Sequence, residues 1–325
     1  MKAHKRIILL FFLFATYRQV AFGWGFFAHQ KLNRLAVFLL PPGMLICYKP
    51  NLAFIAEHAV DPDKRRYGVA AEAPRHYIDI DHYGFYPYDA LPRKWENAEA
   101  KFSGDTLQAH GIVPWYIQTM LSRLTKAFKE KNFARIMKYS AEIGHYIADA
   151  HVPLHTSSNH NGQLTGQQGI HAFWESRVPE LLADKEFDFF IGKAMYIKDP
   201  SDFIWQRILE SAKAADSVLT FEKELSKKMP SDKKYAFEER NGVLVRQYSS
   251  AYTIAYNKNL NGMVERRMRL AIFSIASCWY TAWVNAGQPD LKSLADKQFS
   301  EGDMKEFEVL NQAWKKNEAL GRKEE

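Results

Sequence analysis

The apolar residues of this chain recur at helical intervals, and this pattern limits the possible folds more than any other feature. In the segment after Tyr116 they lie on one helical face, at Ile117, Met120, Leu121, Leu124 and Phe128. A second apolar-rich run extends from Met263 to Val284, whereas the alternation typical of strands is scarce. No internal repeat or low-complexity linker divides the chain. We therefore predict a mainly α fold, with a single helical domain over residues 24–290.

The two ends of the chain differ from this domain. A basic start precedes a short apolar stretch from Ile7 to Ala15, and small residues at positions 21 and 23 then precede Trp24. This pattern is typical of a signal peptide over residues 1–23, because a bilayer span needs about 20 apolar residues. We expect an exported protein, periplasmic or secreted, whose mature chain begins at Trp24 and has no transmembrane helix. Residues 291–325 are polar in composition and predict a solvated C-terminal tail.

Composition restricts the chemistry that the chain can perform. Removing residues 1–23 takes away four basic residues and no acidic one, so the formal net charge falls from +7 to +3. Net charge therefore does not indicate a nucleic-acid partner. The two cysteines, Cys47 and Cys278, are too few for a cysteine-rich metal cluster, and they could form either a disulfide or two buried thiols. Any metal chemistry must use carboxylates and some of the 11 histidines.

Two histidine–acid pairs have the spacing of one helical turn. His145 and Asp149 are four residues apart, as are His171 and Glu175. Each pair therefore projects from one face of a helix. The proline four residues after Asp149 should end the first helix and let His155 approach from another direction. A single pair of this kind is usually an ordinary hydrogen bond, but two pairs with a third histidine between them predict a metal site.

The amino-terminal segment supplies further candidate ligands. If cleavage frees Trp24, its amine and carbonyl could chelate a cation, with His29 as an additional ligand. The alternative is that Trp24 and Phe26 only bury an amino-terminal arm. Further along the chain, Asp61 lies 15 residues before His76.

Taken in order, these motifs resemble a known superfamily, the one shared by bacterial zinc-dependent phospholipases C and secreted single-strand-specific three-zinc nucleases. The matching pieces are the Trp24-Gly25 start, His29, Asp61 with His76, the run from His145 through Asp149 to His155, and His171 with Glu175. They span residues 24–175, about half of the chain, and the ordered set is far more specific than any single motif. The resemblance implies a mainly α-helical domain with zinc ions at the base of a cleft.

The resemblance also implies three zinc ions and a ligand set for each. One zinc would be bound by Asp61, His76, His145 and Asp149. A second would be bound by His155, His171 and Glu175. A third would be bound by the amine and carbonyl of Trp24, by His29 and by a bridging Asp149. Asp63 could substitute for Asp61, but the family's spacing to His76 favours Asp61.

The reaction that the resemblance implies is phosphodiester hydrolysis. A hydroxide held between the two zincs that Asp149 bridges would attack phosphorus in line, and the remaining zinc would neutralise charge on the leaving oxygen. The catalytic residues would be Asp149 and Asp61, the latter orienting or deprotonating the water. Lys64 or Arg65 would add positive charge toward the phosphate, and the family's spacing favours Lys64.

The substrate is the open point. The short interval between His155 and His171, together with Glu175, resembles the phospholipase branch, so we predict a phospholipase C type hydrolase acting on phospholipid. In contrast, Tyr77 and Asp79 resemble the nuclease segment in which an aromatic ring stacks on a base and the acid accepts hydrogen bonds from it. A single-strand-specific nuclease acting on single-stranded nucleic acid is therefore the alternative. A non-catalytic periplasmic zinc- or lipid-binding protein is disfavoured by the complete ligand set, and no obligate protein partner is inferred.

Overall fold

The computed structural model describes residues 25–240, 242–316 and 319–320, so the expected signal peptide and Trp24 lie outside the described residues. The longer helices are α1 (Phe26–Val37), α5 (Trp95–Phe102), α7 (Val113–Lys129), α8 (Phe133–Asp149), α11 (Pro200–Lys228), α13 (Ser250–Asn259), α14 (Met263–Asn285) and α15 (Glu301–Lys316). The shorter helices are α2 (Pro42–Tyr48), α3 (Leu52–Glu57), α4 (Asp61–Arg65), α6 (Gly104–His110), α9 (Ile170–Ala172), α10 (Val178–Leu182) and α12 (Ser231–Lys234). Single helical turns form η1 (His58–Val60), η2 (Ala73–Arg75), η3 (Ile80–Tyr83), η4 (Pro153–Thr156), η5 (Phe173–Arg177) and η6 (Lys292–Leu294), and two antiparallel strands, β1 (Tyr235–Arg240) and β2 (Val243–Tyr248), complete the structure.

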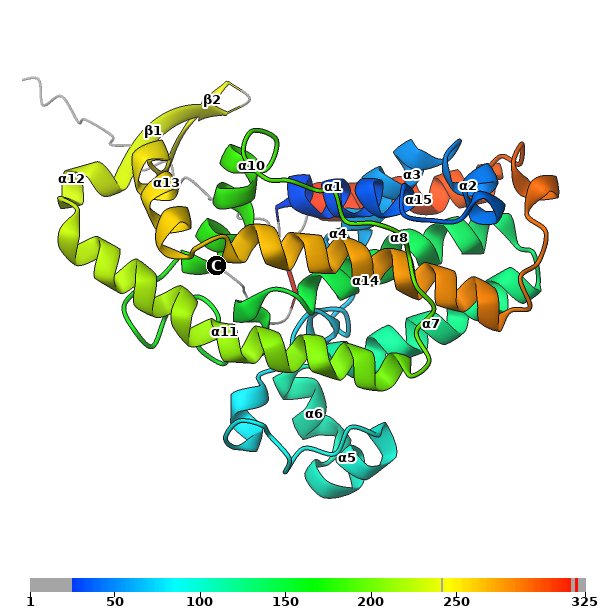
Figure 1. The fold of residues 1–325 in the computed structure, drawn as a ribbon, viewed down its shortest axis with the longest axis horizontal. Helices are drawn as coiled ribbons and strands as arrows, with labels where there is room; N and C mark the ends of the chain where they lie inside the picture. Colours follow the sequence, from blue (N-terminus) through cyan, green and yellow to red (C-terminus); the bar gives the residue numbers. More distant parts are fainter. Residues whose placement is uncertain (1–24, 241, 317–318, 321–325) are drawn as a thin grey trace, which may run out of the picture.

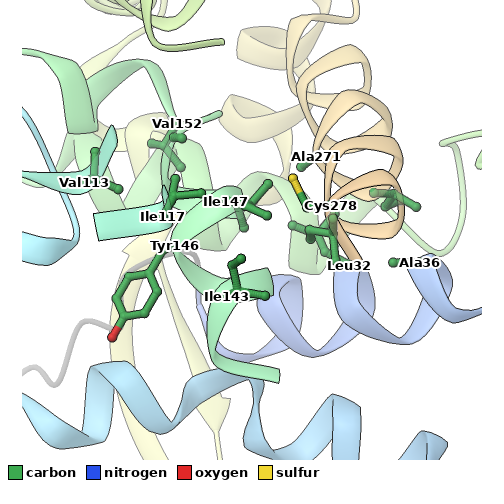
Figure 2. Close-up of a cluster of buried hydrophobic side chains, with 14 of the residues drawn as sticks. Leu32, Ala36, Val113, Ile117, Ile143, Tyr146, Ile147, Val152, Ala271 and Cys278 are labelled. Atoms are coloured by element: carbon green, nitrogen blue, oxygen red, sulfur yellow. The ribbon is translucent and has the colours of Figure 1, made fainter. Parts of the chain in front are cut away.

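The core lies where α14 crosses the middle of the molecule and packs against α1, α7 and α8 (Figure 1). Figure 2 shows side chains from these four helices meeting there, among them Leu32, Ile117, Ile143, Ile147 and Cys278. The helical face predicted after Tyr116 is buried along its whole length. The mainly α-helical prediction is therefore confirmed, and the burial of these faces accounts for much of the fold's stability because apolar burial is the dominant favourable contribution.

Helix α8 carries two of the predicted ligands, and its ends are set by local chemistry. The Asn132 side chain accepts a hydrogen bond from the N–H of Arg135 (3.1 Å) and so caps the first turn. At the other end Val152 is extended, because a residue that precedes proline avoids the helical conformation. The following turn η4 brings His155 back toward the end of α8, as the position of Pro153 predicts.

Helices α1 and α8 approach each other closely at Gly144. A Cβ atom at this position would lie 2.0 Å from Oδ1 of Asn33, which no real structure allows. Asn33 in turn donates from its Nδ2 to the carbonyl oxygen of Ala141 (2.9 Å) and so fixes α1 against α8. This contact matters for the site because His29 lies one turn before Asn33 and His145 directly follows Gly144.

Two segments were not foreseen in the sequence. The hairpin of β1 and β2 extends away from the helical body (Figure 1). Part of the segment assigned to a polar tail forms α15, which packs against α4 and buries Phe307. The rings of Trp314 and Phe26 lie 5.2 Å apart, so α15 also reaches the start of α1.

Cys47 and Cys278 are both buried and both free, so the alternative of two buried thiols is the one that the structure shows. Within the described part of the chain, every helix is too short or too polar to cross a bilayer.

Candidate metal centre

Three residues from one stretch of chain form the first group, which we call the His155 cluster: His155, His171 and Glu175. The Nε2 atoms of the two imidazoles lie 3.3 and 3.1 Å from Oε2 of the carboxylate, and only 3.1 Å from each other. All three side chains are buried. Neither carboxylate oxygen of Glu175 accepts a hydrogen bond within the described residues, which is costly for a buried charge unless a cation is bound.

The hydrogen bonds of these histidines determine which nitrogen faces the cluster. Nδ1 of His155 bonds to the carbonyl oxygen of His76 (2.6 Å), and Nδ1 of His171 bonds to that of His160 (3.1 Å). A carbonyl oxygen only accepts, so both Nδ1 atoms carry the proton. The other nitrogen of each ring, Nε2, therefore faces the other ring and the carboxylate, and it offers a lone pair in the tautomer that binds a metal. Three acceptors that converge in this way repel one another, whereas a divalent cation between them would satisfy all three.

Local structure explains why these residues converge. Gly169 has a φ of +90°, a conformation that L side chains rarely adopt, and it turns the chain into the short helix α9 that carries His171. The chain then continues as η5, a π-helical turn that carries Glu175. Turns of this kind are uncommon and occur often at functional sites. The predicted pairing of His171 with Glu175 across one turn is present.

Residues from several separate elements form the second group, which we call the His76 cluster: His29, Asp63, His76, His145 and Asp149. Oδ2 of Asp149 lies 3.0 Å from Nδ1 of His76 and 3.2 Å from Nε2 of His145. Its other oxygen, Oδ1, lies 3.5 Å from Nε2 of His29. One carboxylate therefore faces histidines on two sides, as expected for a residue that bridges two cations.

Hydrogen bonding also fixes the ring of His145. Its Nδ1 donates to the carbonyl oxygen of Ala59 (2.8 Å), so its Nε2 lone pair faces the cluster. The rings of His29 and His145 stack with their centroids 3.9 Å apart, an arrangement that the close approach of α1 and α8 makes possible. Two stacked imidazoles repel each other when both carry a positive charge. Burial, followed by the nearby His145, places the pKa of His29 well below its ordinary value.

Electrostatics in the His76 cluster favour bound positive charge. Burial alone would lower the pKa of His76, but the carboxylates of Asp149 and Glu72 raise it to about 9. Burial would raise the pKa of Asp149, but His145 and His155 outweigh it and hold that pKa well below its usual range. Burial raises the pKa of Asp63 to about 6. Buried carboxylates that face imidazoles in this way are a donor set that fits zinc.

The structure brings Asp63 to this cluster and does not bring Asp61. Oδ1 of Asp63 lies 3.5 Å from Nε2 of His145 and 3.8 Å from Nδ1 of His76. Asp61 instead lies 2.6 Å from Nδ1 of His58 and 3.2 Å from Nζ of Lys64. Residues two apart on a helix point to nearly opposite sides, so only one aspartate of α4 can face the histidines. The position expected for Asp61 is thus occupied by Asp63.

The two basic residues predicted to face the phosphate have other partners. Lys64 donates to Asp61, and its ammonium lies 5.9 Å from the ring of Trp314. The guanidinium of Arg65 pairs with Glu142 and lies 3.4 Å from Glu72. Both cations are therefore neutralised by carboxylates beside the His76 cluster.

The two residues that resemble the nuclease segment are buried. Tyr77 is only 3% exposed, and its hydroxyl donates to the carbonyl oxygen of Ala109 (3.4 Å). Asp79 is also buried, with Oδ2 3.7 Å from Nδ1 of His110. The exposed ring needed to stack on a base is therefore not present at Tyr77.

Sequence reasoning missed Glu72, which is completely buried behind His76. Its Oε1 lies 3.7 Å from Nε2 of His76, on the side of the ring away from Asp149. Arg75 donates to its other oxygen, Oε2 (2.5 Å), whereas the hydroxyl of Tyr146 donates to Oε1. The signal was available, because Glu72 and His76 have the same spacing of four as the two pairs that were recognised.

Comparison with known proteins agrees with this geometry. The model of a family described as zinc-dependent phospholipase C matches residues 28–238, roughly two thirds of the chain. No curated protein matches the chain. The matched range includes every residue of the His155 and His76 clusters, whereas α13, α14 and α15 lie beyond it.

Proposed function

The chain belongs to the zinc-dependent phospholipase C family and is a phosphodiester hydrolase, and on this premise we propose that it cleaves phospholipids in the phospholipase C manner. The observation that carries the proposal is the convergence of two buried clusters whose imidazole lone pairs and carboxylates face one another. The short interval from His155 to His171, which ends with Glu175 as the acid, supports the phospholipase branch over the nuclease branch.

We propose that three zinc ions occupy the two clusters. One would be bound by Asp63, His76, His145 and Asp149. A second would be bound by His155, His171 and Glu175. A third would be bound by His29, the second oxygen of Asp149 and the freed amine and carbonyl of Trp24. When bound, zinc would lower the pKa of a coordinated water to about 7 and would place positive charge near the phosphate.

The chain's own residues would orient this chemistry. Asp149 lies between His29 and the pair of His76 and His145, so it would hold two ions at a fixed separation. Asp63 takes over the role expected of Asp61, because its Oδ1 faces the histidines and its buried Oδ2 accepts no hydrogen bond within the described residues. That second oxygen is available to accept a proton from the attacking water.

We also propose export with cleavage after Gly23. The N–H of Gly25 donates to Oγ of Ser176 (3.0 Å), the residue that follows Glu175. Gly25, which directly follows the amine-bearing residue that cleavage would expose, is therefore held beside the segment that carries Glu175. This contact supports a ligand role for the mature amino terminus over simple burial of an amino-terminal arm.

A single-strand-specific nuclease is the second candidate, because Tyr77 and Asp79 resemble the nuclease segment. The burial of Tyr77 and the hydrogen bond of its hydroxyl to Ala109 disfavour this function. A base could stack on this ring only if the surrounding chain moved away from it.

The direct test uses the mature protein beginning at Trp24, with phosphatidylcholine and single-stranded DNA as parallel substrates. We expect chelator-sensitive release of phosphocholine, and none from His155→Ala, which removes one ligand of the His155 cluster. Release of nucleotides without phosphocholine would support the second candidate. Turnover that survives both chelation and His155→Ala would contradict a zinc mechanism.

A further inference from the structure

Two large apolar side chains are exposed on the β1–β2 hairpin, which projects from the helical body (Figure 1). Phe237 is 68% exposed and Leu244 is 59% exposed. In the strand register Phe237 pairs with Arg246 and Leu244 pairs with Glu239, so the two apolar residues are diagonal neighbours on one face. Two adjacent exposed apolar side chains on a projecting hairpin are unusual, because most exposed apolar residues occur singly.

Charged residues of both signs lie on the same face as this apolar pair, because Arg246 is opposite Phe237 and the exposed Glu239 is opposite Leu244. Arg246 is exposed beside Phe237, with its guanidinium stacked 3.8 Å from the ring of Tyr235. Three exposed lysines lie just before the hairpin, Lys227 and Lys228 at the end of α11 and Lys233 in α12. A combination of exposed apolar side chains and flanking cations fits the boundary of a membrane with anionic lipids.

The base of the hairpin is attached to the segment that carries Glu175. Arg177, two residues further on in the π-helical turn η5, donates to Oε1 of Glu238 in β1 (2.6 Å) and to the carbonyl oxygen of Tyr248 in β2 (3.0 Å). The ring of Phe173, from the same turn, stacks on Tyr248 with centroids 3.7 Å apart. These contacts join the hairpin to η5, the turn that carries Glu175 of the His155 cluster.

Lys234 also fixes the end of the hairpin that joins the helical body. Nζ of Lys234 lies 2.7 Å from Oε1 of the buried Glu222. It also lies 5.5 to 5.7 Å from the ring centroids of Tyr235, Tyr248 and Tyr252, within the range of cation–π attraction. The hairpin is thus tied to α11 and α13, and its position relative to the metal ligands is set.

We propose that the exposed face of this hairpin that carries Phe237, Leu244 and Arg246 docks the enzyme on an anionic phospholipid surface. The inference rests on the proposed phospholipid substrate, which the enzyme must reach in a bilayer. A lipid surface suits this patch better than a protein does, because a stable protein interface buries about 800 Å² on each partner and two side chains offer far less. Docking through the hairpin would hold the His155 cluster at a fixed orientation to the membrane.

The test measures vesicle binding without turnover. The wild type and the double variant Phe237→Ser/Leu244→Ser are sedimented with phosphatidylcholine vesicles, with and without phosphatidylglycerol, in the presence of a chelator. Phe190→Ser is the matched control, because Phe190 is 85% exposed in the loop between α10 and α11 and is not part of the hairpin. We expect the double variant to bind anionic vesicles at least about tenfold more weakly, and the control to change by less than about twofold.

Equal vesicle binding by the wild type and the double variant would overturn the proposal. A wild-type dimer that becomes monomeric in the double variant, with vesicle binding unchanged, would instead identify a surface for a second copy and would also overturn it. Binding to anionic vesicles that falls as salt rises supports the role of the cations.

A second measurement separates this proposal from the proposed function. Hydrolysis of a short-chain phosphatidylcholine below its micellar concentration should be equal in the zinc-loaded wild type and double variant, whereas hydrolysis of anionic vesicles should fall at least about tenfold in the variant. If the wild type cleaves no monomeric phospholipid, the proposed function fails, while the sedimentation result still decides whether the hairpin docks. If the double variant loses monomer hydrolysis too, the hairpin serves the catalytic centre and the docking proposal is overturned.

Discussion

The His155 cluster and the His76 cluster contain similar side chains but are assembled differently. All members of the first come from residues 155–175, and its histidines are oriented by backbone carbonyls. The members of the second come from α1, α4, α8 and the segment at His76, and the buried Glu72 lies behind it with the half-buried Arg65 and Arg75. The first depends on a local turn, whereas the second depends on how distant helices pack. A substitution in the His155 cluster should therefore affect only its own zinc ion, whereas an equivalent substitution in the His76 cluster should affect more than one ion or the packing of the helices.

The largest effect is expected for Asp149→Asn. Because one carboxylate faces His29 on one side and His76 with His145 on the other, its neutralisation should remove two zinc ions and reduce phosphodiester hydrolysis to background. Elemental analysis of the purified variant measures this directly. Glu175→Gln is the matched substitution in the His155 cluster and should remove one ion only. Equal metal loss in the two variants would contradict the bridging role.

The next prediction separates the two aspartates of α4. Asp63→Asn should lose the ion of the His76 cluster and nearly all activity, because Asp63 faces His76 and His145. Asp61→Asn should keep that ion, because Asp61 contacts His58 and Lys64 instead. The measurement is zinc content together with kcat for both variants. Retention of all zinc by Asp63→Asn, with loss in Asp61→Asn, would restore the assignment expected from sequence spacing.

A backbone substitution tests whether helix packing supports the His76 cluster. Gly144→Ala places a Cβ atom 2.0 Å from Oδ1 of Asn33 and should lower the free energy of unfolding by about 1–3 kcal/mol, as overpacking does. Gly302→Ala in α15 is the control, because its Cβ atom would have only ordinary contact, 3.6 Å from Oγ of Ser300. Chemical denaturation of the metal-free proteins gives both values. A Gly144→Ala protein as stable as the control would show that α1 and α8 do not need this close approach.

The smallest effect is expected for Glu72→Gln. Glu72 faces the Nε2 side of His76 and does not reach the cluster itself, so its loss should weaken zinc affinity by about 10–100-fold without abolishing binding. Competition with a chromophoric chelator measures the affinity, and the ion of the His155 cluster should be unaffected. Unchanged affinity would show that Glu72 only pairs with Arg65, Arg75 and Tyr146 and does not support the zinc ligand His76.

The sequence was most informative where periodicity and burial coincide. The apolar face of α7, the histidine–acid pair of α8 and the pair that spans α9 and η5 follow from helical spacing alone, and the structure contains all of them. The position of Asp63 could not be derived in this way, because α4 has only five residues and spacing along the chain does not give its rotation. The hairpin was missed because its exposed face mixes Phe237 and Leu244 with charged residues, although Asn241-Gly242 is a strong turn signal.

The segment after residue 290 shows a different limit. Its polar composition indicates a solvated tail, but Phe307 and Trp314 supply enough apolar contact to pack α15 against α4 and the start of α1. Average composition hides two well-placed aromatic side chains. Tertiary packing of this kind decides the structure of a mainly polar helix.

The most direct measurement is the zinc content of a chain whose amino terminus is verified as Trp24, compared with a chain that carries one additional residue before it. The proposed ligand sets predict three zinc ions per chain in the first protein and two in the second, because the extra residue displaces the chelating amine. Three ions in both would contradict the role of the amino terminus. One ion or none in the first protein would contradict the central claim that the His155 and His76 clusters together bind three zinc ions.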